Sequence, residues 1–135
     1  MSEENVEVVR RAWDAWTRGD FEALFGTFDP AVEWTTTNFV GWPEDDVYSG
    51  QGGVRRFFEE WRDSWERYEA GTDEILDAGG DRVLVLAWQR GVGRGSHVPV
   101  EMEFAQLCTL RRGLIRRMDA YSDRQAALEA AGLRE

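Results

Sequence analysis

The chain has 135 residues, which suits one domain and is long enough to bury a core without disulfides or a structural metal. A net charge of −10 argues against nucleic acid as a partner, because phosphate binding requires clustered positive charge. No apolar run approaches the roughly 20 residues of a membrane-spanning helix, and no targeting peptide is visible, so we expect one cytoplasmic domain over residues 1–135 that does not bind membranes.

The basic and sulfur-containing residues exclude several chemistries. All 16 basic residues are Arg, so the chain has no Lys with which to form a Schiff base. The single Cys108 cannot form an internal disulfide, and with only one histidine, His97, it cannot form a Cys/His zinc site. We therefore expect no metal and no cofactor, and we expect His97, beside a turn, to be exposed.

Helical spacing and turn residues organise the N-terminal third. Trp13 and Trp16 recur at helical spacing with two earlier valines, Gly19 suits a helix stop, and Pro30 excludes a helix at the residue before it. The expected elements are a helix over residues 3–18, a short helix over residues 20–27 and a strand over residues 31–36.

Turn-forming residues dominate from 37 to 53, a long irregular stretch of the kind that often binds ligands or covers a site. Its aromatics Phe39 and Trp42 could cover an opening or simply anchor the loop to the core. A helix with an aromatic stripe is predicted to follow, over residues 52–68. Such a stripe is usually core packing.

The C-terminal half is predicted to form strands. The clearest hairpin joins residues 98–110 to residues 114–121 through Arg111-Arg112-Gly113. Earlier strands are predicted over residues 69–77 and 82–90, and Asp123 can cap a last helix that Gly132 ends. Helices followed by successive strands predict an α+β domain, in which a curved, mostly antiparallel sheet wraps around three N-terminal helices and a short C-terminal helix follows.

Several short motifs resemble one family. They are Arg18-Gly19-Asp20-Phe21-Glu22-Ala23-Leu24, Ala31-Val32-Glu33-Trp34, Tyr48-Ser49-Gly50 with Gly53-Val54-Arg55-Arg56-Phe57-Phe58, Gly80-Asp81-Arg82-Val83, Phe104-Ala105-Gln106, Arg112-Gly113-Leu114-Ile115 and Met118-Asp119-Ala120-Tyr121. Together they resemble the SnoaL-like family of the NTF2-like superfamily, which includes nuclear transport factor 2, ketosteroid isomerases and polyketide cyclases. The resemblance covers nearly the whole chain and implies a cone-shaped fold with a deep apolar pocket and, in many members, a homodimer formed through the outer sheet face. It specifies a reaction poorly, because this fold hosts many functions.

The resemblance also implies where catalytic groups would lie. In ketosteroid isomerases three positions carry a carboxylate base, a phenolic donor and a protonated acid. The matching positions in this sequence are Trp34, Ala12 and Gln106, so none of the three isomerase residues is present. Gln106 could still donate a hydrogen bond to a carbonyl. Polyketide cyclases use a late-strand Asp, which makes Asp119 the leading candidate base. The alternative for Asp119 is a structural role beside Arg117 or at a dimer interface, because alternation with pocket-lining neighbours would point it outward.

Aromatic residues supply the expected ligand contacts. We expect the pocket to be lined by Trp13, Trp34, Phe57, Trp61, Trp88, Phe104 and Met118, with Gln106 orienting the ligand. If Trp88 points inward, the strand period also directs Arg90 inward, where its charge could bind an acidic ligand. Equally, Arg90 could pair with Glu101 or Glu103 across the hairpin.

Three functions follow from these observations. The first is a protein that binds a small apolar or aromatic metabolite in an aromatic-lined pocket. The alternative is a cofactor-independent isomerase or cyclase, in which Asp119 removes a proton and Gln106 or Arg90 stabilises the enolate. The second alternative is a non-catalytic dimerisation or partner-binding domain. A carboxylate that points into the cavity with a raised pKa would discriminate the first two.

Overall fold

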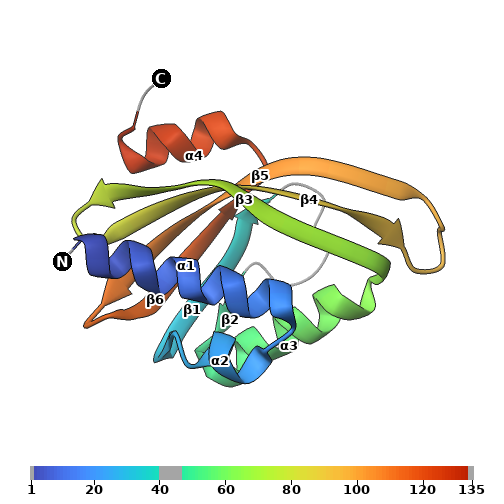
Figure 1. Ribbon diagram of the computed structural model, residues 1–135, viewed down its shortest axis with the longest axis horizontal. Coiled ribbons are helices and arrows are strands. Elements are labelled where there is room, and N and C mark those ends of the chain that lie inside the picture. Colours follow the sequence, from blue (N-terminus) through green and yellow to red (C-terminus); the bar gives the residue numbers. More distant parts are fainter. Residues whose placement is uncertain (1, 40–46, 134–135) are drawn as a thin grey trace.

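A computed structural model describes residues 2–39 and 47–133, which form four helices and one open six-stranded sheet (Figure 1). The elements in chain order are α1 (Ser2–Arg18), α2 (Phe21–Phe25), β1 (Phe28–Asn38), β2 (Val47–Ser49), α3 (Gly50–Asp63), β3 (Trp65–Gly79), β4 (Arg82–Gly93), β5 (Pro99–Arg111), β6 (Leu114–Tyr121) and α4 (Arg124–Ala131). Within these described ranges, no helix is long and apolar enough to cross a membrane.

The strand order across the sheet is β2-β1-β6-β5-β4-β3. Only the β1–β6 pair is parallel among the described strand pairs, so the sheet is mostly antiparallel, as predicted. Helices α1, α2 and α3 lie on one face of the curved sheet, and α4 lies on the other (Figure 1). The α+β architecture expected from the sequence is therefore confirmed.

The β5–β6 hairpin turns where the sequence predicted. Arg112 and Gly113 have φ values of 53° and 77°, and Arg111 pairs with Leu114 on either side of them. Two consecutive positive φ values are typical of the type I′ turn, whose twist matches that of the flanking strands. This hairpin places β5 and β6 side by side at the centre of the sheet.

Both faces of β4 are buried, and the two faces belong to different cores. Val83 and Val85 face the helices α1–α3, whereas Leu84 and Leu86 face α4. All four are at most 7% exposed, which explains the nearly continuous apolar run in this strand. The inner core contains most of the aromatic residues and surrounds the cavity described below.

The third helix is shorter than predicted. It ends at Asp63, and Trp65 and Tyr68 belong instead to β3, where Tyr68 pairs with Gly91 of β4. Aromatic residues fit a strand as well as a helix, so the long pairing with β4 decides their conformation. The predicted loop over residues 37–53 also contains the strand β2, which pairs with β1. Trp42 lies outside the described residues.

The last helix follows its predicted capping signals. The carboxylate of Asp123 accepts a hydrogen bond from the Gln125 backbone N–H at 2.9 Å, and Gly132 ends the helix with a φ of 76°. Arg124 then fastens α4 to the sheet, because its guanidinium donates to the Ala87 carbonyl and to the Asp73 carboxylate, both at 2.6 Å. Helix α4 thereby covers the part of the outer face formed by Leu84, Leu86, Ala105 and Leu107.

Candidate active-site cavity

A cavity of about 80 Å³ lies between the inner sheet face and the helices. Six of the predicted ligand contacts line it, together with Gln106. They are Trp13, Trp34, Phe57, Trp61, Phe104 and Met118. None of the lining residues within the described ranges is Asp, Glu, Arg or His. The volume is well below the roughly 300–1,000 Å³ of drug-sized ligand pockets, so a ligand larger than a single ring requires side chains to move.

Phe58 on α3 contacts several rings of the aromatic cluster beside the cavity. Its ring centroid lies 4.9 Å from that of Trp16, 5.0 Å from that of Trp34 and 5.3 Å from that of Phe57. It also stacks on Phe28 with an interplanar angle of 10°. Such ring pairs stabilise beyond the area that they bury, so Phe58 holds α3 against α1 and β1.

One polar pair crosses the cavity between α1 and β5. The Trp13 indole N–H donates to Gln106 Oε1 at 3.1 Å. An indole nitrogen can only donate, so the amide of Gln106 must present its oxygen to Trp13. The Gln106 amide nitrogen has no hydrogen-bond partner within residues 2–39 and 47–133, and it is therefore available to a ligand.

A second polar group lies between β3 and β4. The Tyr68 hydroxyl donates to Gln89 Oε1 at 2.9 Å. Burial raises the pKa of Tyr68 to about 12, and the neighbouring Trp61 and Trp16 side chains oppose this rise more weakly. Tyr68 is therefore neutral at physiological pH and acts as a hydrogen-bond donor to Gln89.

The indole N–H of Trp34 is a further cavity-lining donor without a partner among the described residues. Trp34 is 6% exposed, and its Nε1 is buried without a hydrogen-bond partner among the described residues. Trp65 Nε1 is unpaired in the same sense, but Trp65 does not line the cavity. Buried donors are nearly always paired in folded proteins, so each such group requires an explanation.

Cys108 and Tyr68 predict an alkaline loss of stability. Burial raises the pKa of the Cys108 thiol to about 12, with a further contribution from Asp119. The unfolded chain ionises both groups near pH 9 to 10, whereas the folded chain keeps them neutral, so stability is complete below pH 9 and falls as pH rises toward 12. We expect urea unfolding to show a loss on the order of 4 kcal/mol by pH 11, most of it from Cys108. The Cys108→Ala variant should lose less over this interval, and an equal loss would contradict the assignment.

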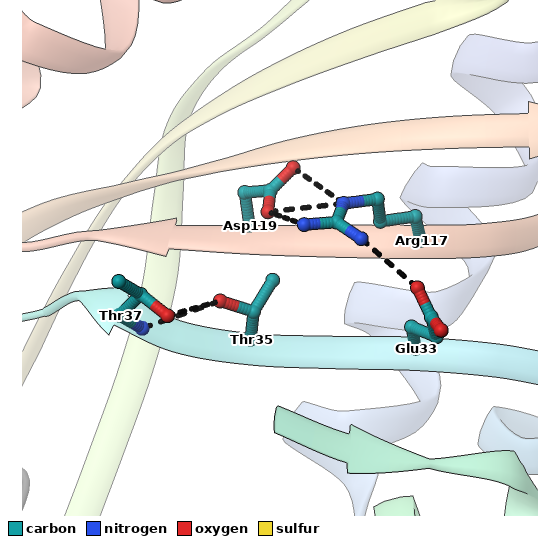
Figure 2. A network of polar contacts seen from close by, with 5 residues as sticks. All are labelled: Glu33, Thr35, Thr37, Arg117 and Asp119. Carbon is teal, nitrogen blue, oxygen red and sulfur yellow. Dashed lines mark hydrogen bonds and ion pairs between the residues drawn. The ribbon is translucent and has the colours of Figure 1, made fainter. Parts of the chain in front are cut away.

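Asp119 lies on the outer face of the sheet, away from the cavity (Figure 2). The Arg117 guanidinium binds its carboxylate at 3.1 Å and also donates to Glu33 of β1 at 2.9 Å. Hydrogen bonding to Asp119 is the main cause of the raised pKa of Arg117. The neighbouring Met118 and Ala120 line the cavity, so strand alternation accounts for the outward direction of Asp119.

Trp88 and Arg90 on β4 point away from the cavity, and not into it as considered from the sequence. Gln89 is 2% exposed and lines the cavity, so its neighbours Trp88 and Arg90 lie on the outer face. There the Arg90 guanidinium lies 5.2 Å from the centre of the Trp88 ring and pairs with Glu69 of β3. Arg90 thus pairs on β3 rather than on β5, and its charge does not reach the cavity.

The only histidine is exposed, as expected from its position beside a turn. His97 Nδ1 lies 3.2 Å from the Glu66 carboxylate, and the His97 side chain is 72% exposed. In the part of the chain that the structure describes, no group of three or more His, Cys, Asp or Glu side chains could hold a metal ion. Neither observation adds a charged group to the cavity.

Sequence comparison identifies the family. Residues 9–118 match the profile of the SnoaL-like domain. No curated protein matches the chain. Most of the chain, from within α1 to within β6, therefore carries the SnoaL-like pattern.

Solved structures support the same fold. An NTF2-like protein from Burkholderia thailandensis E264 is 25% identical, with a TM-score of 0.79, and the match covers 93% of this chain and 95% of that one. TerC, co-crystallised with polyporic acid, is 21% identical, with a TM-score of 0.77 and coverage of 96% and 98%. A candidate SnoaL-like polyketide cyclase from Jannaschia sp. CCS1 is 22% identical, with a TM-score of 0.76 and coverage of 96% and 92%. The profile match and the shared fold show that the chain belongs to the SnoaL-like domain family.

Proposed function

We propose that the protein binds a small apolar or aromatic molecule in the cavity between its sheet and helices. The observation that carries this proposal is a cavity lined by aromatic rings and a few polar groups, without a charged side chain among its described lining residues. Small-molecule sites usually have this composition. TerC, which has the same fold, was co-crystallised with polyporic acid, and this supports a small-molecule ligand.

Ligand-observed NMR with single-ring compounds tests this proposal. Toluene and acetophenone are expected to receive saturation transfer from the protein and to compete with each other. The Ala12→Leu variant is the matched control, because Ala12 lines the cavity and is 6% exposed, so the larger side chain fills the cavity without changing the surface charge. Binding by the wild type that Ala12→Leu leaves unchanged would contradict a site in the cavity.

The alternative of an isomerase or cyclase lacks a supporting observation. Its base would be Asp119, whose carboxylate is bound by Arg117 on the outer face (Figure 2). Proton abstraction requires the base within hydrogen-bond reach of the substrate. Gln106, in contrast, lines the cavity and remains suited to orient a carbonyl ligand.

The Asp119→Asn variant separates the two functions. We expect its affinity for single-ring ligands to stay within about twofold of the wild type and its stability to fall by less than about 1 kcal/mol, because the ion pair is partly exposed. The same NMR titration and urea unfolding measure both quantities. A loss of more than tenfold in affinity by a fully folded variant would contradict the proposal and favour a role for Asp119 at the site.

We also propose that two copies associate through the outer face of β1 and β6. Helix α4 packs mainly on β4 and β5, and Glu33 and Arg117 present both charge signs on the neighbouring strands, which suits a two-fold contact. Sedimentation velocity tests this association. A monomer at micromolar concentration would contradict it, and cavity binding does not depend on the result.

A further inference from the structure

We propose that the ligand is uncharged and carries a hydrogen-bond acceptor, such as the carbonyl of a small ketone, and that the indole N–H of Trp34 donates to it. This inference rests on the proposed function and specifies the chemistry that the cavity selects. Trp34 then acts as the group that determines specificity, in addition to supplying contact area.

The indole N–H of Trp34 is a buried hydrogen-bond donor that lacks an acceptor among the described residues. Its Nε1 is buried, has no hydrogen-bond partner among the described residues and belongs to a side chain that borders the cavity. A donor in this position loses its hydration on folding and gains no partner in return. A ligand that brings an acceptor into the cavity gives this donor a partner. The hydrogen bond then contributes more to the binding free energy than one to a donor that is already hydrogen-bonded to water.

The other available groups are also donors. The oxygen of Gln106 accepts from Trp13, and the oxygen of Gln89 accepts from Tyr68, which leaves the two amide nitrogens without partners in residues 2–39 and 47–133. For Gln106 the assignment follows from its partner, because an indole can only donate, and for Gln89 the Tyr68 hydroxyl donates to the amide oxygen at 2.9 Å. The cavity therefore offers several N–H groups to a single acceptor-bearing ligand.

Charged ligands are disfavoured at the same site. A carboxylate would lose its hydration in a cavity whose described lining residues include no Arg or His. An ammonium group would find no carboxylate among the described lining residues to balance its charge, and the side-chain oxygens of Gln89 and Gln106 each already accept one hydrogen bond. Arg90, which could have balanced an acid, pairs with Glu69 on the outer face. Neutral acceptors are the chemical class that remains.

Three probes of similar size and shape separate the effect of a hydrogen-bond acceptor on affinity from the effect of a charge. They are acetophenone, which has a carbonyl acceptor; isopropylbenzene, which has none; and benzoate, which is charged at pH 7. Affinities are measured by titrating ¹⁵N-labelled protein and following the indole N–H resonances in ¹H–¹⁵N correlation spectra. The Trp34 resonance is assigned by its loss in Trp34→Phe. Trp65→Phe is the matched control, because it removes an equally unpaired indole that does not line the cavity.

We expect acetophenone to bind about three- to tenfold more tightly than isopropylbenzene, as one net hydrogen bond implies, and benzoate to bind at least tenfold more weakly than acetophenone. Acetophenone should move the Trp34 indole proton downfield and leave that of Trp65 in place. Trp34→Phe should bring the ratio of acetophenone to isopropylbenzene affinity close to one, whereas Trp65→Phe should preserve it. Using the ratio removes the effect of the changed cavity shape, because that effect acts on both probes.

Two negative results have different meanings. If acetophenone and isopropylbenzene bind equally, or if Trp34→Phe leaves their ratio unchanged, the inference about Trp34 is overturned while cavity binding stands. If none of the three probes shifts a cavity resonance, the proposed function falls and the inference falls with it. Tightest binding of benzoate would also overturn the preference for neutral ligands.

Discussion

Phe58→Ala is expected to lower the free energy of unfolding by about 3–5 kcal/mol, as measured by urea unfolding. The ring of Phe58 contacts those of Trp16, Phe28 and Trp34, so its removal takes away contacts with both α1 and β1. The space left behind adjoins the existing cavity, which surrounding groups can fill only in part. The cost therefore includes a cavity contribution as well as the lost transfer of the ring from water.

Phe21→Ala serves as the control for this variant. Phe21 lies at the rim of the same aromatic cluster and is only partly buried, with contacts to Trp16 and Phe25. We expect a loss of about 1–2 kcal/mol, because less area returns to water. Toluene should restore part of the stability of Phe58→Ala but not that of Phe21→Ala, since only the former enlarges an enclosed volume. Equal losses in the two variants would contradict the central role assigned to Phe58.

Gly91→Ala is expected to cost about 3 kcal/mol, because the added methyl group meets backbone that cannot move independently. A Cβ at this position would lie 2.2 Å from the Arg67 carbonyl oxygen and 2.8 Å from the ring of Trp65. Both belong to β3, which pairs with β4 along its whole length. Thermal or urea unfolding measures the loss, and the β3–β4 pair is expected to show the largest changes in amide hydrogen exchange.

Gly52→Ala is the matched control, because the same substitution at this position should not lower the stability. Gly52 lies in the first turn of α3, and a Cβ there would meet no atom within 4 Å. Because alanine favours the helix, the substitution should leave stability unchanged or raise it by up to about 1 kcal/mol. If Gly91→Ala proved as well tolerated as Gly52→Ala, the close approach of β3 and β4 at Gly91 would be refuted.

Local signals predicted much of the fold because they act over a few residues. The cap at Asp123, the stop at Gly132 and the turn at Arg112-Gly113 each depend on side-chain and backbone preferences within one turn. The end of α3 could not be placed in this way. Trp65 and Tyr68 suit either a helix or a strand, and the distant strand β4 determines which one they join.

The cavity was predictable in its aromatic part and less so in its polar part. Alternation along β5 placed Phe104 and Gln106 on one face, as the structure has them. Along β4, however, both faces are apolar, so alternation alone could not decide whether Trp88 or Gln89 faces inward. The pairing of Gln89 with Tyr68 joins residues on two strands, and nothing in the local sequence signals it.

The most decisive experiment is a crystal structure of the protein grown with acetophenone. We expect electron density for the ligand in the cavity bordered by Trp13, Trp34 and Phe104, with its oxygen about 2.7–3.2 Å from Trp34 Nε1. The Arg117–Asp119 ion pair should remain on the outer face. A cavity without ligand density in crystals where acetophenone binds elsewhere on the protein would contradict the account.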